Sequence, residues 1–147
     1  MKIKPLSSRE FRDIYSKVPR ICVEVVIKNE NGIVLTERSI EPYLGLWHIP
    51  GGTGVYGEPL ERAVRRVAKD EVGVDVEVEK LLGYIEYPDE ESVRGFGWPI
   101  GIAFLLKIKS GELRGGVQGE TVETFQEAPE KMVEPQRKFL SDIGLLK

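Results

Sequence analysis

The sequence contains few residues of the kinds that cross-link a chain or act alone as catalysts. Its 147 residues include one cysteine, Cys22, and one histidine, His48. A single cysteine excludes a disulfide within the chain, and the apolar run around Cys22 favours a small core residue over a nucleophile. His48 would be the first candidate for a base near neutral pH. It lies between Trp47 and Ile49 in a short predicted strand, where alternation places it opposite those two residues, so we interpret it as structural.

Long apolar runs and an excess of one charge are also absent. No segment is long enough to span a bilayer and the N-terminus does not resemble a signal peptide, which predicts a cytoplasmic protein without a membrane partner. Charges of both signs are interspersed, and the net charge of −3 provides no overall field that would attract nucleic acid. A polyanionic substrate would therefore be held locally, by a metal ion and individual arginines. Repeats and linkers are absent, and the length fits a single domain over residues 1–147.

Apolar segments separated by turn residues predict a mixed sheet covered by helices. We expect strands over residues 21–28, 33–38, 46–49, 74–78, 81–86, 100–108 and 120–126. We expect helices over about 8–17, within 58–73 and over 135–145, and a polar loop over 88–92. In the last helix the residues expected to face the core are Phe139, Leu140 and Ile143. Short strands with two or three helices are typical of an α+β fold.

The N-terminal helix has a recognisable beginning. Ser7 or Ser8 can cap it because Glu10 follows at the spacing of a capping box. Phe11 and Ile14 give the helix an apolar edge. This edge could pack on the rest of the domain or contact a second copy of the chain in a homodimer.

The stretch from Gly51 to Val74 combines a glycine-rich loop with a charged amphipathic helix. Glu58 and Pro59 suit the first turn of the helix, and Gly73 suits a left-handed residue that ends it. Between them runs an apolar stripe at three- and four-residue spacing, formed by Leu60, Ala63, Val64, Val67 and Ala68. The stripe indicates that this helix packs on the core.

Two carboxylates, Asp70 and Glu71, lie in the last turn of the same helix. The C-terminal end of a helix favours cations, so a bound cation would offset the cost of placing two negative charges there. The glycine-rich loop brings backbone carbonyls towards this helix, and Mg²⁺ takes oxygen ligands while it retains waters and substrate phosphates. The alternative is an ordinary loop and a solvated surface helix.

Three other positions outside this stretch are candidates for a binding site. Glu24 interrupts an apolar strand, where it faces either a cleft or water, and exposure at the edge of the sheet is the simpler explanation. Arg38 follows the second predicted strand, and its planar guanidinium could hold phosphate oxygens at two points or remain solvated. Trp98, like Tyr87, could stack on a base or sugar, or could belong to the core or a lid.

The glycine-rich stretch resembles the sequence box of the Nudix hydrolases, here residues 52–74. Val67 stands in place of the glutamate that follows the arginine of the box, and Asp70 replaces the first glutamate of the next pair. The preceding segment, Gly45 to Gly52, is similar to the usual entry to the box. The positions that match the box are Gly52, Glu58, Arg66, Glu71, Gly73 and Val74. On these residues the chain is identified as a member of the family.

The resemblance implies a Nudix fold, an α/β/α sandwich with a mixed sheet between helices. It also implies hydrolysis of a nucleoside diphosphate linked to another moiety, with Mg²⁺ or Mn²⁺ as cofactor. Glu71 and the carbonyl of Gly51 would hold the metal, with Asp70 as a shorter and more distant ligand. In many members the glutamate replaced by Val67 binds a further metal or acts as the general base. Because valine can do neither, either activity is lost or the attacking water is activated elsewhere.

Over most of its length the chain is similar to one branch of the family, the GDP-mannose mannosyl hydrolases, which lack the same glutamate and cleave at the sugar carbon. This similarity implies that Arg38 and Arg66 contact the diphosphate, that Glu24 faces the substrate and that Gln118 binds the metal. The general-base histidine of that branch would fall at Gly119, which cannot serve. A replacement base would have to come from Glu24, Glu120, Glu123 or the 88–92 loop, within hydrogen-bond reach of the water.

Three functions therefore stay open. The first is hydrolysis of a nucleoside diphosphate derivative such as a nucleotide sugar, with Glu71, Arg66, Arg38 and Glu24 as the catalytic residues and Trp98 at the substrate. The second is hydrolysis of a nucleoside triphosphate or dinucleotide by attack at phosphorus. The third is a module that binds a nucleotide or nucleotide sugar without hydrolysing it.

Overall fold

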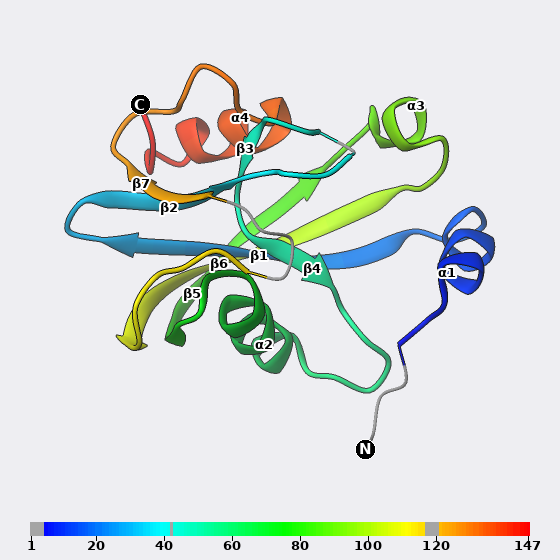
Figure 1. The fold of residues 1–147 in the computed structure, drawn as a ribbon, viewed down its shortest axis with the longest axis horizontal. Coiled ribbons are helices and arrows are strands. Elements are labelled where there is room, and N and C mark those ends of the chain that lie inside the picture. The colour runs from blue at the N-terminus through cyan, green and yellow to red at the C-terminus, as the bar shows by residue number, and fades with distance from the viewer. Residues whose placement is uncertain (1–4, 42, 117–120) are drawn as a thin grey trace.

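The expected strands form one mixed sheet, and helices cover both of its faces (Figure 1). Gly51–Thr53, predicted as part of a glycine-rich loop, adds a further short strand because it pairs with the first strand. The computed structural model describes residues 5–41, 43–116 and 121–147. In chain order the elements are α1 (Ser8–Tyr15), β1 (Arg20–Asn29), β2 (Gly32–Glu37), β3 (Trp47–His48), β4 (Gly51–Thr53), α2 (Leu60–Val72), β5 (Asp75–Glu86), α3 (Glu90–Arg94), β6 (Pro99–Ser110), β7 (Thr121–Phe125) and α4 (Glu134–Asp142). The predicted α+β class and its layered arrangement are confirmed.

The central strand β1 changes its partner along its length. On one edge β1 is parallel to β6. On the other edge Lys28 and Asn29 pair with β2, whereas residues 22–24 pair with β4, which places Gly51 opposite Glu24. The sheet runs in the order β3-β2-β1-β6-β5, with β4 joined to β1 and β7 joined to β2. The change of partner brings the glycine-rich segment next to the carboxylate of the central strand.

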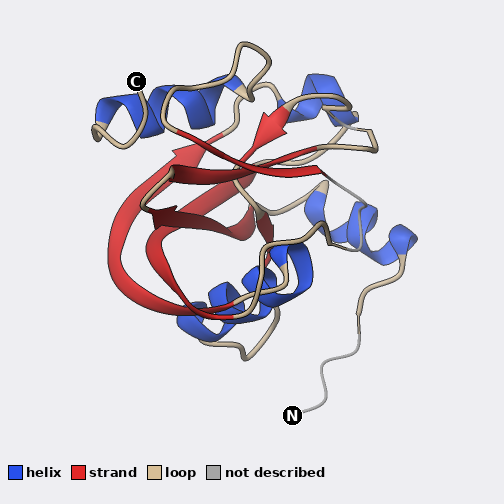
Figure 2. Cartoon of the chain, turned by 60° about the vertical axis from the view of Figure 1, so that its left-hand side comes forward, coloured by secondary structure: helices blue, strands red, loops and turns tan. Residues whose placement is uncertain are grey.

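Two apolar cores lie on the two faces of this sheet. Successive side chains of a strand point to opposite faces, so Val23 and Val25 pack with α2, whereas Val26 belongs to the core that contains Leu140 of α4. Figures 1 and 2 show α2 on one side of the sheet and α4 on the other. Glu24 is two residues before Val26 and therefore points to the same face of the sheet, which α4 covers.

Helix α2 begins at Leu60, so Glu58 and Pro59 precede it and do not form its first turn. Pro59 caps the helix in an extended conformation, which its fixed φ permits, and its carbonyl accepts the first helical hydrogen bonds. Leu60 is exposed because the first turn lies outside the core, whereas the rest of the predicted stripe is buried. Gly73 ends the helix with φ of 76°, the left-handed conformation expected for it.

Three smaller predictions are corrected by the structure. Residues 74–78 and 81–86 belong to one strand, β5, because shifts in its register with β6 accommodate the residues between them. The stretch 88–92 is not a loop throughout, because α3 begins within it. Ile143 is exposed rather than in the core, because α4 ends at Asp142 and the chain turns away.

Helix α1 has the predicted capping box. The Ser7 hydroxyl accepts a hydrogen bond from the Glu10 amide at 3.1 Å, and the Glu10 carboxylate accepts one from the Ser7 amide at 3.0 Å. The helix ends at Tyr15, slightly before the predicted limit, and buries none of its residues. Within the described part of the chain, no helix combines the length and hydropathy needed to cross a membrane.

Candidate functional site

A cavity of about 300 Å³ collects side chains from β1, β4, α2, α3 and α4. Four of the predicted site residues line it, namely Glu24, Arg38, Gly51 and Glu71. They come from β1, from the loop after β2, from β4 and from the last turn of α2. The fold therefore brings together residues that are far apart in the sequence.

Glu24 is buried in the wall of this cavity, so its predicted exposure at the edge of the sheet is wrong and the cleft interpretation holds. The Tyr87 hydroxyl donates to Glu24 Oε1 at 2.8 Å, and Gln136 Nε2 donates to Glu24 Oε2 at 3.4 Å and to the Tyr87 hydroxyl at 2.9 Å. Gln136 is itself fixed, because its Oε1 accepts from the Ile49 amide at 2.6 Å. Burial raises the pKa of Glu24 to about 8, although the hydrogen bond from Tyr87 opposes the shift.

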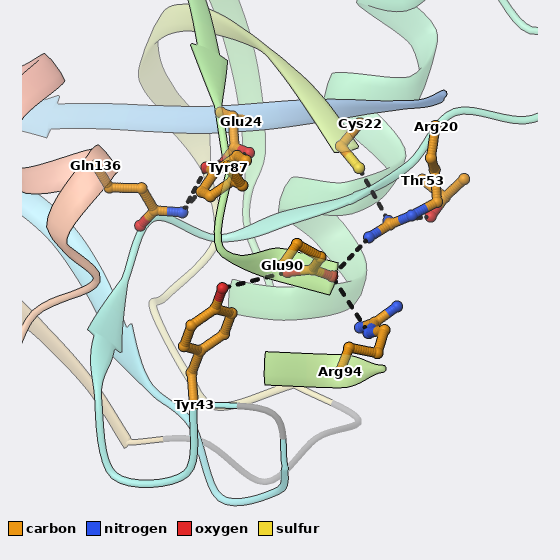
Figure 3. A network of polar contacts seen from close by, with 9 residues as sticks. All are labelled: Arg20, Cys22, Glu24, Tyr43, Thr53, Tyr87, Glu90, Arg94 and Gln136. Carbon is orange, nitrogen blue, oxygen red and sulfur yellow. Dashed lines mark hydrogen bonds and ion pairs between the residues drawn. The ribbon is translucent and has the colours of Figure 1, made fainter. Parts of the chain in front are cut away.

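A second group of charged side chains lines another part of the cavity (Figure 3). Glu90 Oε2 lies 3.4 Å from Arg20 Nη2 and 3.2 Å from Arg94 Nε. Arg20 Nη1 also donates to Thr53 Oγ1 at 2.9 Å, and the Tyr43 hydroxyl donates to Glu90 Oε1 at 3.3 Å. One buried carboxylate of α3 thus pairs with Arg20 of β1 and with Arg94 of its own helix.

Cys22 and His48 behave as structural residues, as predicted, although both line the cavity. Burial raises the pKa of the Cys22 thiol to about 11, so the nucleophilic thiolate is disfavoured. His48 Nδ1 lies 2.9 Å from the Ile49 carbonyl, and its Nε2 lies 3.0 Å from Thr36 Oγ1. This pairing fits a neutral ring with the proton on Nδ1, and burial lowers the pKa of His48 to about 4.

Arg66 holds the glycine-rich loop to α2 and does not line the cavity. Its Nε donates to Glu58 Oε2 at 2.9 Å, and its Nη2 donates to Glu58 Oε1 at 3.0 Å and to the Thr53 carbonyl at 3.1 Å. Two parallel hydrogen bonds fix the plane of the guanidinium against the carboxylate. These contacts favour support of the loop as the role of Arg66.

The two carboxylates in the last turn of α2 differ in their position relative to the cavity. Glu71 lines the cavity, whereas Asp70 is exposed and does not. The chain also passes directly beside this helix end at Gly116, where an added Cβ would lie 2.5 Å from the Asp70 carbonyl oxygen and 2.6 Å from Glu71 Cα. A side chain would not fit there, so glycine permits the close approach.

Arg38 and Trp98 occupy different surroundings. Arg38 lines the cavity, and its backbone closes the loop before β3 through hydrogen bonds with Leu46 and Gly45. Trp98 is 43% exposed and lines a separate hollow beside α1. The structure therefore brings Arg38 to the other site residues and leaves Trp98 apart from them.

The sequence profile of the NUDIX domain matches residues 18–143. The chain belongs to the Nudix family. It is 35% identical over 120 residues to the low-salt glycan biosynthesis protein Agl8 of Haloferax volcanii, an alignment that covers 80% of this chain and 77% of that protein. It is 36% identical over 107 residues to the ADP-ribose pyrophosphatase of Methanocaldococcus jannaschii, covering 73% of this chain and 62% of that protein.

The Nudix fold is shared with solved structures as well. The crystal structure of a MutT NUDIX hydrolase from Burkholderia pseudomallei aligns with a TM-score of 0.74 at 26% identity, covering 86% of this chain and 99% of that one. The protein is therefore a Nudix hydrolase with the predicted α/β/α layers.

Nudix hydrolases typically use a divalent metal ion. The described residues fit a metal ion that is bound by only a few protein groups. No group of three or more histidine, cysteine, aspartate or glutamate side chains converges within residues 5–41, 43–116 and 121–147. Glu71 and Gly51 line one cavity and offer a carboxylate and a backbone carbonyl. This donor set suits Mg²⁺, which commonly binds one or two carboxylates and completes its shell with waters and substrate phosphates.

Val67 cannot supply the carboxylate that many Nudix hydrolases have at its position. It is buried in the core with Val64 and Ala68, as its place in the apolar stripe indicated. Among the residues considered as a replacement base, Glu123 is exposed on β7 and does not line the cavity. Gln118, Gly119 and Glu120 lie outside the described residues.

Several residues of the cavity were not among the predicted site residues. Arg20 is four residues before Glu24 on β1, so alternation places both side chains on the same face of the strand. This pattern could have indicated that Arg20 lies in the cavity. Glu90 lies within the 88–92 stretch that was considered for a base, but as part of α3. Tyr43 and Gln136 reach the cavity through long-range packing, and nothing in their local sequence indicates it.

Proposed function

We propose that the protein hydrolyses a nucleoside diphosphate linked to a second moiety, with Mg²⁺ or Mn²⁺ as cofactor. Glu71 and the Gly51 carbonyl would hold the metal, and Arg38 would contact the diphosphate. The observation that supports this most directly is the lining of one cavity by these three residues together with Glu24. The substrate is a small molecule, since a cavity of about 300 Å³ matches a nucleotide-sized ligand better than a macromolecule.

A bound divalent cation would neutralise the diphosphate and stabilise the charge that develops as the bond breaks. Arg38 adds a second positive group on the same cavity. Asp70 is exposed, which supports an indirect contribution through water, and Gln118 is proposed as a further ligand from family similarity alone. Arg66 supports this arrangement by fixing the loop that follows Gly51.

Glu24 is proposed to orient the attacking water or a substrate hydroxyl. Glu90 is paired with two arginines, whereas the Glu24 carboxyl accepts hydrogen bonds from the neutral side chains of Tyr87 and Gln136. Those donors hold the Glu24 carboxyl in one orientation beside Gly51. The position is suited to a group that acts on the reacting atoms.

Attack at phosphorus is supported by one relative, which is named an ADP-ribose pyrophosphatase. Attack at the sugar carbon, as in GDP-mannose mannosyl hydrolases, is a second candidate. It is favoured by the buried Val67 in place of the usual glutamate and by the position of Arg38 and Glu24 in the cavity. For either reaction Trp98 would contact substrate only if the ligand extends beyond this cavity.

The test is a screen of nucleotide sugars, dinucleotides and nucleoside triphosphates with Mg²⁺ and with Mn²⁺, followed by hydrolysis in ¹⁸O water. Label in the released phosphate would support attack at phosphorus, and label in the sugar would support attack at carbon. Turnover of any member would also eliminate a function limited to binding. Absence of turnover across the whole set, by folded protein, would contradict the proposed function.

A separate proposal concerns α1 as a contact in a homodimer. The helix buries none of its residues, and Leu6 before it and Ile14 within it are exposed. A dimer would cover this apolar edge. A monomeric mass in light scattering at assay concentrations would rule it out.

A further inference from the structure

Gln136 is a buried polar residue on the face of α4 that packs on the sheet. It is 6% exposed, and Leu140, four residues later on the same face of the helix, belongs to the apolar core on this side. An apolar side chain would be enough for packing at such a position, and a buried carboxamide is costly unless it is hydrogen-bonded. The contacts of Gln136 therefore indicate what the residue does.

The hydrogen bonds of Gln136 lead to residues of the cavity, which Gln136 also lines. Its Oε1 accepts from the Ile49 amide at 2.6 Å. Its Nε2 donates to the Tyr87 hydroxyl at 2.9 Å and to Glu24 Oε2 at 3.4 Å. Figure 3 shows this side chain extending from α4 towards Tyr87 and Glu24. One side chain of the last helix thus joins β1, the end of β5 and the segment before Gly51.

The Ile49 amide determines which way round the carboxamide lies. A backbone N–H can only donate, so the oxygen of Gln136 faces Ile49 and its NH₂ group faces Tyr87 and Glu24. The Tyr87 oxygen accepts from Gln136, so the single proton of its hydroxyl is directed to Glu24 Oε1 at 2.8 Å. The donors therefore all point one way along this chain, from the backbone to the Glu24 carboxyl.

The two oxygens of Glu24 have different surroundings as a result. Oε1 accepts the short hydrogen bond from Tyr87 and lies against Gly101, where an added Cβ would overlap it. Oε2 receives the longer contact from Gln136 and lies towards Gly51, whose added Cβ would be 3.2 Å from it. A separation of 3.4 Å between donor and acceptor makes a weak hydrogen bond. Oε2 is therefore the oxygen better able to accept from a water or a substrate hydroxyl.

We propose that Gln136 is a positioning residue for the reaction: it commits Glu24 Oε1 to Tyr87 and presents Glu24 Oε2 to the attacking water or the substrate hydroxyl. Gln136 acts through Glu24 and not on the reacting atoms. This gives α4, which lies outside the glycine-rich box, a part in the reaction. The inference rests on the proposed function, because the orientation of Glu24 matters to turnover only if Glu24 acts on the reacting atoms.

The test is a double-mutant cycle of Gln136→Met and Glu24→Gln. Both kcat and KM are measured on the best substrate of the screen, at a pH above the Glu24 pKa of about 8. Gln136→Met keeps the length of the side chain and removes its hydrogen bonds, so we expect kcat to fall about tenfold and KM to change by less than about twofold. In the Glu24→Gln background the same substitution should lower kcat by no more than about twofold, because it acts through the group already removed.

A control and a second variant separate this role from a structural one. Gln126→Met makes the same substitution at an exposed glutamine and should leave kcat and KM unchanged. Gln136→Glu keeps an oxygen for the Ile49 amide, but its carboxylate competes with Glu24 for the Tyr87 hydroxyl. Its kcat should therefore also fall, again without further loss in the Glu24→Gln background. Thermal unfolding shows which variants are folded, and Gln136→Glu completes the cycle if Gln136→Met does not fold.

Several outcomes would overturn the inference. A further tenfold loss of kcat in the Glu24→Gln background, or wild-type kcat for folded Gln136→Met, would reject the positioning role and leave the proposed function standing. Failure of both Gln136 variants to fold would show that the residue serves the fold itself. Absence of turnover by the folded wild type would contradict the proposed function, and the inference would fail with it.

Discussion

Glu24 owes its surroundings to three distant residues: Tyr87 just after β5, Gln136 of α4 and Gly101 of β6. Tyr87 and Gln136 donate to its two oxygens, and Gly101 of β6 leaves room for it, since an added Cβ would overlap the Glu24 carboxyl. A buried carboxyl with both oxygens engaged keeps one orientation. Its apolar neighbours in the sequence indicate that the position is unusual, but they do not reveal these partners, which lie 63 and 112 residues away.

Replacement of Glu24 by glutamine tests its role at the reacting atoms. Glu24→Gln preserves the shape and removes a carboxyl that ionises with a pKa of about 8, so above that pH we expect kcat to fall by about 10²-fold or more, as for loss of a group that acts on the attacking water. Tyr87→Phe removes one hydrogen bond and should cost less, because Gln136 still contacts the carboxyl. Steady-state kinetics on the best substrate of the screen provide the measurement. Equal kcat for Glu24→Gln and the wild type would reject a role in catalysis.

His48 should make the free energy of unfolding depend on pH under acidic conditions. Its pKa is lowered to about 4 by burial, whereas in the unfolded chain it is near the ordinary value of 6.5. Below pH 6.5 the unfolded chain therefore binds a proton that the folded protein excludes, and stability falls as the pH drops towards 4. The contribution is roughly 3 kcal/mol, since each unit of difference corresponds to about 1.4 kcal/mol.

His48→Gln should remove this part of the dependence. Free energies of unfolding from urea titrations between pH 7 and 4 should fall less steeply for the variant than for the wild type. Parallel curves for the two proteins would show that His48 does not titrate differently on unfolding.

At the scale of elements, the local sequence predicted where helices begin or end better than it predicted which of their residues are buried. Ser7 with Glu10 marked the start of α1, and Gly73 marked the end of α2. The exposure of Leu60 and the formation of α3 were missed, because both depend on where the element sits against the sheet and not on the residue type. Periodicity reports which face of an element is apolar, whereas tertiary packing decides how far along the element the core extends.

The end of α2 depends on the segment that passes beside it. Gly116→Ala would place a Cβ 2.5 Å from the Asp70 carbonyl oxygen, so either the segment or the helix end has to shift. Because Glu71 lies at the same end, we expect kcat/KM to fall by about tenfold or more with a smaller change in thermal stability. Gly54→Ala is a matched control, since its Cβ would meet Ile21 at an ordinary 3.5 Å. Unchanged kinetics for Gly116→Ala would show that the contact does not position Glu71.

At the scale of the whole molecule, the site exists because β1 is shared between β2 and β4. This arrangement places the loop after β2, the glycine-rich strand and the end of α2 around one cavity. The box and its resemblance to Nudix hydrolases predicted the family and the layers. Glu71 and Gly51 line the same cavity, and their role as metal ligands stays a prediction. The arginine cluster could not be predicted in full, because Arg20 and Arg94 meet only after β1 and α3 pack together.

The central claim is that Glu71 carries the metal-dependent reaction in this cavity. Its most direct test is Mg²⁺-dependent turnover of Glu71→Gln, with Glu61→Gln in the first turn of the same helix as a control of equal charge change. We expect kcat/KM to fall at least about a hundredfold for Glu71→Gln and to change little for Glu61→Gln, with both variants folded. Wild-type turnover by folded Glu71→Gln at every Mg²⁺ concentration would contradict the account.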